Sequence, residues 1–181
     1  MSNEARLPPS ERRPFERGVS LLETVIALLI LLTVSLGIMP LGLMAVSKTE
    51  SEGHLVARVT EYSQDKMEQL LSLAYGDAGT DTRVFPAAAT GGTGLAVGGS
   101  ADPDATVALY VDYLNATGDL IPATGTTAPS GWFYKRVWQI DLPAGTTGIK
   151  RVTVTTISAR RIGVFGIVPR ATLVSLKTLP F

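Results

Sequence analysis

One acidic residue, Glu23, stands at the entrance of the longest apolar segment of the chain. The next 24 residues, Thr24 to Ser47, carry no charge, and roughly 20 apolar residues are enough to cross a bilayer as a helix. A carboxylate inside a membrane costs at least a few kcal/mol when it has no partner, so a cation is expected near it. Helix capping is a second explanation, because Ser20-x-x-Glu23 fits a capping box.

Other residues that could carry chemistry are few. The chain has no cysteine, which excludes disulfides, thiolate metal sites and cysteine nucleophiles. His54 is the only histidine, and a lone histidine makes neither a catalytic triad nor a histidine-based metal site. With 16 basic and 16 acidic residues the formal net charge is zero, which does not favour a nucleic-acid binder. We therefore expect no enzyme, no cofactor and no metal site.

The uncharged segment and its surroundings predict a long helix behind a polar leader. Residues 1–18 hold three prolines and four arginines; the prolines disfavour a stable helix, and the arginines favour a cytoplasmic location for this end. A helix is expected from about residue 20 to about residue 75, with Gly76 as its C-cap. Pro40 lies inside it and predicts a kink or local unwinding.

Beyond residue 47 the expected helix becomes amphipathic. A stripe at 3.6-residue spacing is formed by Val56, Val59, Ser63, Met67, Leu70 and Ala74. A Gly/Ala/Thr-rich, mobile loop is expected next, and then strands at 107–111, 132–141, 149–160 and 171–179. Alternation along the second strand predicts one shared face for Trp132, Tyr134, Arg136, Trp138 and Ile140, with both tryptophans in the core. A small sheet needs a cover, so we expect the stripe to pack on it in an α+β fold.

The run Arg17-Gly18-Val19-Ser20-Leu21-Leu22-Glu23-Thr24 resembles the class III signal of type IV pilins and of the pseudopilins of type II secretion. The resemblance implies that a prepilin peptidase cuts after Gly18 and methylates the new amino terminus at Val19. Glu23 is then the fifth residue of the mature chain, and its partner in a filament would be the amino terminus of a neighbouring subunit. Pro40 matches a proline that in type IV pilins accompanies a stretch of helix that melts in the filament.

The C-terminal part is similar to PilV-type minor pilins and to the related I-type pseudopilin. The similarity rests on Tyr134, Arg136, Trp138 and Ile140, on Ile149, Lys150, Val152, Thr153, Val154 and Thr155, and on 174–179. It implies a type IV pilin-like fold, in which a long N-terminal α-helix packs on a small antiparallel β-sheet. The expected parts are a leader over 1–18, a transmembrane or filament-core half-helix over 19–47, an amphipathic half-helix over 48–75, a loop over 76–106 and a sheet domain over 107–181.

On this resemblance the expected function is that of a minor pilin or pseudopilin, a structural subunit in type IV pilus assembly or in type II secretion. The implied partners are other pilins or pseudopilins, the prepilin peptidase, the inner-membrane assembly platform and the inner membrane. The chain would cross the inner membrane once, with its amino terminus in the cytoplasm and its C-terminal domain in the periplasm, before it enters a filament. Two rivals stay open: a membrane-tethered periplasmic binding module with an uncleaved anchor, and a secretory signal cut after Ala45-Val46-Ser47.

Overall fold

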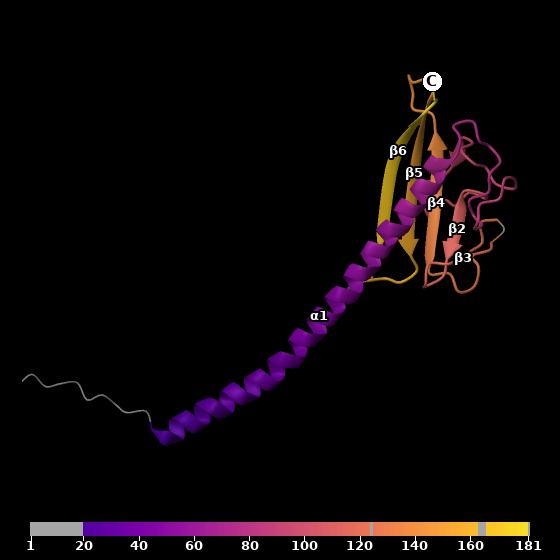
Figure 1. The fold of residues 1–181 in the computed structure, drawn as a ribbon. Coiled ribbons are helices and arrows are strands. Elements are labelled where there is room, and N and C mark those ends of the chain that lie inside the picture. The colour runs from indigo at the N-terminus through magenta and orange to yellow at the C-terminus, as the bar shows by residue number, and fades with distance from the viewer. Residues whose placement is uncertain (1–19, 124, 163–165, 181) are drawn as a thin grey trace, which may run out of the picture. The chain divides into compact units, whose positions relative to one another are not determined.

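Figure 1 shows a computed structural model of the chain, which describes residues 20–123, 125–162 and 166–180, apart from the side chains of residues 47, 48, 50 and 51. The chain divides into two compact units, Met1–Val46 and Ser47–Phe181. Helix α1, Leu21–Ser72, begins in the first unit and ends in the second. The second unit also holds one antiparallel sheet. The expected α+β arrangement of a long, initially apolar helix and a small antiparallel sheet is confirmed.

Helix α1 contains Pro40 without interruption. Proline removes one backbone hydrogen bond and crowds the preceding turn, which was the reason to expect a disturbance at this point. The local unwinding is not present in the structure, because the residues on both sides of Pro40 remain helical. A kink at Pro40 stays a prediction.

The C-terminal end of α1 lies at Ser72, earlier than the expected end near residue 75. Two lysines of the sheet bind carbonyl groups there: Lys177 Nζ donates to Leu71 O, and Lys150 Nζ donates to Tyr75 O at 2.8 Å. Cationic groups at a helix C-terminus compensate the negative end of the helix dipole. The helix therefore ends on the sheet, and the expected C-cap at Gly76 is wrong.

The sheet has the strand order β3-β2-β4-β5-β6, with β1 paired to β4. Its strands are β1 Gly98–Gly99, β2 Val111–Leu114, β3 Leu120–Ile121, β4 Tyr134–Asp141, β5 Ile149–Ser158 and β6 Arg170–Thr178. Strands expected at 132–141, 149–160 and 171–179 are confirmed. The strand expected at 107–111 is wrong, because the N–H of Tyr110 donates to Val107 O in a turn and Leu109 has a φ of 68°, outside the β region.

One face of the sheet packs on the second half of α1. Met67 and Leu70 of the helix join Trp138 in one apolar cluster, and Val59 joins Tyr134 in another. The expected stripe is thus confirmed for its buried members Val59, Ser63, Met67 and Leu70. The expected stripe is wrong for two members. Ala74 lies beyond the C-terminal end of the helix, and at the N-terminal end of the stripe Leu55 is buried instead of Val56. Each helical residue is turned by about 100°, so neighbours cannot share a face.

The opposite face of the sheet is covered over β2 and β4, whereas Val174 and Leu176 of β6 are exposed on it. Val111, Tyr113 and Val137 form a buried cluster there, and Trp132 packs against it with its ring 6.1 Å from that of Tyr113. The expected position of Trp132 against the helix is wrong. Strand β4 begins only at Tyr134, so the alternation that correctly places Trp138 does not extend back to residue 132.

The segment between α1 and β2 is a loop over most of its length, as expected for 76–106, but part of it packs on the sheet. Leu95 is fully buried in the cluster of Met67 and Trp138. Strand β1 adds two residues of ladder beside Ile140 and Gln139. Its glycines are required by space, since a Cβ on Gly99 would lie 2.2 Å from Trp138 O. The glycine-rich composition therefore reflects close packing on the sheet.

Candidate functional site

The first unit consists, in its described part, of an apolar helix whose side chains are exposed. The stretch Leu21–Val46 has a mean hydropathy of 2.5 and is long and apolar enough to cross a membrane. At about 1.5 Å per residue its length exceeds the roughly 30 Å of a bilayer core. Large exposed apolar surfaces mark contacts with membranes or with other proteins. The composition of this helix therefore suits lipid or neighbouring apolar helices.

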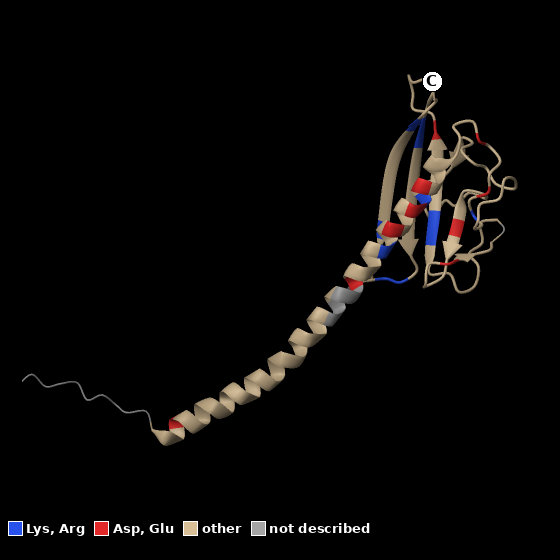
Figure 2. Ribbon diagram, viewed as in Figure 1, with Lys and Arg blue, Asp and Glu red and all other residues tan. Residues whose placement is uncertain are grey.

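Glu23 is the one charged residue in the described part of the first unit, and it lies in the first turn of α1 (Figure 2). Its backbone N–H donates to Ser20 Oγ at 3.2 Å and to Ser20 O at 2.9 Å, so Ser20 caps the helix. That cap uses the backbone of Glu23, whose carboxylate is exposed at the positive end of the helix dipole. The expected cleavage residues Gly18 and Val19 lie outside the described residues.

A buried ion cluster lies in the second unit, between α1 and the sheet. It consists of Lys66 and Asp65 on α1, Asp112 on β2 and Arg136 on β4. The Arg136 guanidinium binds both oxygens of Asp112, at 2.7 Å from Nε to Oδ1 and 2.9 Å from Nη2 to Oδ2. Lys66 Nζ lies 2.9 Å from Asp112 Oδ2. Lys66, Asp112 and Arg136 are at most 2% exposed, whereas Asp65, which is 3.1 Å from Arg136 Nη1, is 57% exposed.

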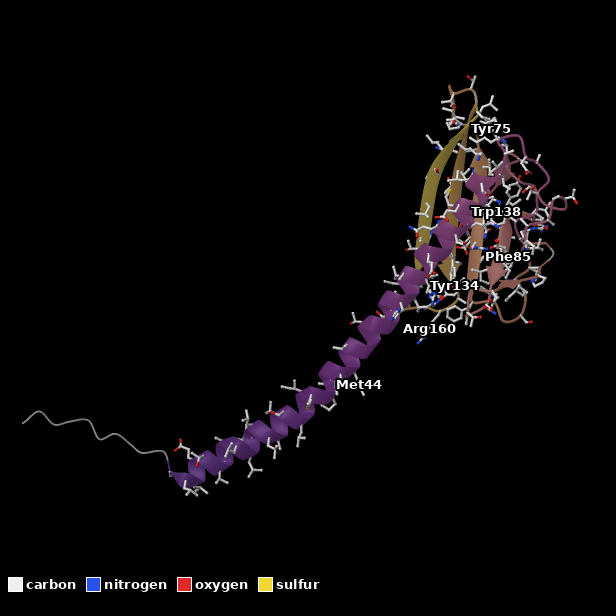
Figure 3. The ribbon with its side chains drawn as sticks, viewed as in Figure 1. Met44, Tyr75, Phe85, Tyr134, Trp138 and Arg160 are labelled. Atoms are coloured by element: carbon white, nitrogen blue, oxygen red, sulfur yellow. The ribbon has the colours of Figure 1, made fainter. Side chains whose placement is uncertain are left out.

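The remaining bonds of Lys66 join the cluster to the loop after α1. Its Nζ donates to Thr82 O at 2.7 Å and to Thr82 Oγ1 at 2.8 Å, and it lies 4.0 Å from the ring centroid of Trp138. Three elements that are far apart in sequence are thereby held together at one ammonium group. In Figure 3 Trp138 lies between Tyr75 and Tyr134 along this unit, so the cluster occupies its middle.

Burial and pairing oppose each other in this cluster. Burial lowers the pKa of Lys66 from 10.5 to about 8, although the nearby Asp112 carboxylate opposes the shift. Burial alone would raise the pKa of Asp112, but the charges of Arg136 and Lys66 and their hydrogen bonds lower it below the usual value. The pKa of Arg136 is raised, because its pairing with Asp112 outweighs burial. At neutral pH the cluster thus holds two buried cations around one buried anion.

Sequence reasoning missed this cluster. Lys66 is not a member of the stripe expected from the sequence, and Arg136 belongs to the expected shared face of the second strand but has no expected partner there. The spacing of Lys66 does carry a signal, because it lies three residues after Ser63 and four before Leu70, both buried. Its partners Asp112 and Thr82 come from other parts of the chain, so no local pattern identifies them.

A cleft of about 590 Å³ opens beside the ion cluster, between α1, the loop after it and the β2–β3 hairpin. It is lined by Asp65, Gln69, Arg83, Val84, Phe85, Leu114, Gly118, Asp119, Leu120, Pro122 and Arg136. Phe85 is 86% exposed. Its ionisable lining residues are Asp65, Asp119, Arg83 and Arg136, and the described residues that line it include no serine, threonine, cysteine, lysine or histidine. Among the described residues no group of three or more His, Cys, Asp or Glu side chains is placed to hold a metal ion, and His54 is exposed.

Comparisons of the chain with protein-family models, with curated proteins and with solved structures found no match.

Proposed function

We propose that this chain is a minor pilin or pseudopilin, a structural subunit that is made as a precursor, anchored in the inner membrane and then built into a filament. The observation that carries the proposal is the position of Glu23, five residues after Gly18 and directly before an uncharged span. Neither an ordinary secretory signal nor an ordinary membrane anchor uses an acid there. The Ser20 cap of α1 binds the backbone of Glu23, and an acid in the first turn also suits the helix dipole, but helix capping does not explain the glycine and the Arg-rich leader that precede it.

The two halves of α1 support different parts of this role. Leu21–Val46 presents apolar side chains that need lipid before assembly and other apolar helices after it. Ser47–Ser72 is held on the sheet by buried apolar side chains such as Leu70 and by the buried charged side chain of Lys66. A subunit of this design can leave the membrane while its sheet domain stays folded. The PilV-type likeness favours type IV pilus assembly over type II secretion.

The partners proposed with this role are the prepilin peptidase, the inner-membrane assembly platform and other pilins or pseudopilins that contact the first half of α1. The proposed topology has one membrane crossing, with the Arg-rich amino terminus in the cytoplasm. The output is mechanical and structural, with no reaction catalysed by the chain itself.

The state of the amino terminus in the membrane-extracted protein tests the proposal. We expect a mature chain that starts at Val19 and is one methyl group heavier than its sequence. The variant Gly18→Leu should stay at precursor length, because the peptidase must fit the residue before the cut; Ser10→Leu is a control in the same leader. Full processing of Gly18→Leu would refute the class III signal.

A second candidate is a membrane-tethered binding module. The cleft beside the ion cluster and the exposed ring of Phe85 at its lining favour it. In that case the protein would keep its start at Met1, so the same mass measurement separates the two functions. A start at Lys48 would instead indicate an ordinary secretory signal.

A further inference from the structure

The basic residues of the second unit are unevenly distributed. Leu142–Phe181 holds six lysines and arginines and no acid, whereas every acid of the second unit lies before residue 142. Three of these basic residues, Lys150, Arg151 and Lys177, bind carbonyl groups or Asp141 at the end of the sheet where α1 terminates. The other three lie at the opposite end, at the connection between β5 and β6.

We call Arg160, Arg161 and Arg170 the basic tip. All three are exposed, and none lies within 4 Å of a carboxylate in the described part of the chain. Arg161 Nη1 donates to Gly166 O at 3.1 Å and Arg170 Nη2 to Ala101 O at 3.4 Å. These bonds orient the guanidinium groups without neutralising them. Ile167, on the same connection, is 60% exposed.

The basic tip lies at the end of the second unit where the chain arrives from the apolar segment. Ala171, next to Arg170, packs against the cluster that contains Val59 of α1, and the N–H of Ala159 donates to Phe133 O. Figure 3 shows Arg160 beyond Tyr134, at the end of the unit opposite Tyr75. Val59 is the thirteenth residue of the chain after Val46, the last residue of the apolar segment.

We propose that the basic tip binds anionic phospholipid headgroups on the leaflet from which α1 emerges. The inference rests on the proposed membrane anchoring of Leu21–Val46. Arginine is suited to this ligand, because its planar fork binds phosphate oxygens in a bidentate manner. The exposed Ile167 can enter the interface between headgroups and acyl chains. Glu52 and Glu61 of α1 lie at the same end, but Glu61 is paired with Arg58 at 3.3 Å.

Such binding would hold the sheet domain against the membrane before assembly. Each basic residue near an anionic surface favours the bound state by about fivefold, and the effect decays within a Debye length. Extraction into a filament would then have to break these headgroup contacts.

The full chain reconstituted in lipid nanodiscs tests the proposal. Because the chain lacks cysteine, Ala159→Cys accepts a single fluorophore at the basic tip, and Ala144→Cys accepts one in the β4–β5 turn at the far end. With a quencher attached to lipid headgroups, we expect quenching of the Ala159→Cys label in discs that contain phosphatidylglycerol. We expect little in phosphatidylcholine discs, and little for the Ala144→Cys label in either.

A charge-matched pair of variants isolates the arginines. Arg160→Gln with Arg161→Gln should lower the equilibrium constant for headgroup contact, obtained from the quenching, by about 25-fold, from two losses of about fivefold each. Ala144→Glu with Thr147→Glu changes the net charge equally at the far end and should leave the quenching unchanged. Equal quenching in both lipids, or equal loss in both variants, would overturn the proposal. A chain that fails to insert in the discs would refute the membrane anchor itself, which carbonate extraction reports separately.

Discussion

Replacing Asp112 by asparagine removes the buried anion of the ion cluster while keeping the size of the side chain. In the structure Asp112 accepts two bonds from Arg136 and lies 2.9 Å from Lys66 Nζ. After the change Lys66 still binds Thr82, and Arg136 still reaches Asp65. Both cations nevertheless remain buried without a buried countercharge. Breaking a buried pair in this way costs about 3–5 kcal/mol.

This loss is large against the total stability of a domain, which is about 5–15 kcal/mol. The matched control is Asp65→Asn, which removes the other carboxylate bound to Arg136. Because Asp65 is 57% exposed, its pair is screened by water and the expected loss is about 0–1 kcal/mol. The variant Lys66→Met tests the coupling between Lys66 and Asp112. In the Lys66→Met background only the Arg136 cation remains buried, so Asp112→Asn should cost about 0.5–3 kcal/mol less than it does in the wild-type chain.

Urea unfolding, followed by tryptophan fluorescence, measures these differences in the free energy of unfolding. Trp138 is a suitable probe because its ring lies 4.0 Å from Lys66 Nζ. The measurement is made on the chain that lacks residues 1–46 and repeated on the full chain in detergent. If Asp112→Asn costs no more than Asp65→Asn, the ion cluster does not hold α1 on the sheet and the reasoning is refuted.

Three further predictions concern the anchor, the domain and pH. Glu23→Ala should be cut and inserted normally yet be absent from sheared filaments. The control Ser20→Ala removes the helix cap at a cost of about 1 kcal/mol and should still assemble. Wild-type filament levels of Glu23→Ala would contradict the pairing with a neighbouring amino terminus. Deletion of residues 1–46 should give a soluble monomer by gel filtration, and aggregation of that fragment would contradict the division between anchor and domain. The stability of the second unit should rise from about pH 8 towards pH 10. The pKa of Lys66 is about 8 in the folded chain and 10.5 in the unfolded chain, so the unfolded chain binds more protons in this pH range. The urea midpoint measures this rise, and Lys66→Met should lack it.

Local patterns were sufficient for the elements that repeat over many residues. The apolar run ahead of Ser47 predicts the exposed helix segment Leu21–Val46, and alternation predicts three of the strands, β4, β5 and β6. These patterns work because helix and strand each impose one period on the side chains. Short elements carry too few repeats, which is why β1, β2 and β3 were missed or misplaced. The roles of Gly18, Val19 and Glu23 come from a motif and stay predictions.

Tertiary packing decided what the periods leave open. A period tells which side chains share a face, but not which charged one among them is buried, because that depends on partners elsewhere in the chain. Lys66 is buried since Asp112 and Thr82 meet it from β2 and from the loop. The glycine-rich segment likewise contains no period, yet it packs because Leu95 fills a place between α1 and β4. The exposed helix needs only its own sequence, whereas the ion cluster exists only once the sheet has brought distant charges within a few ångströms.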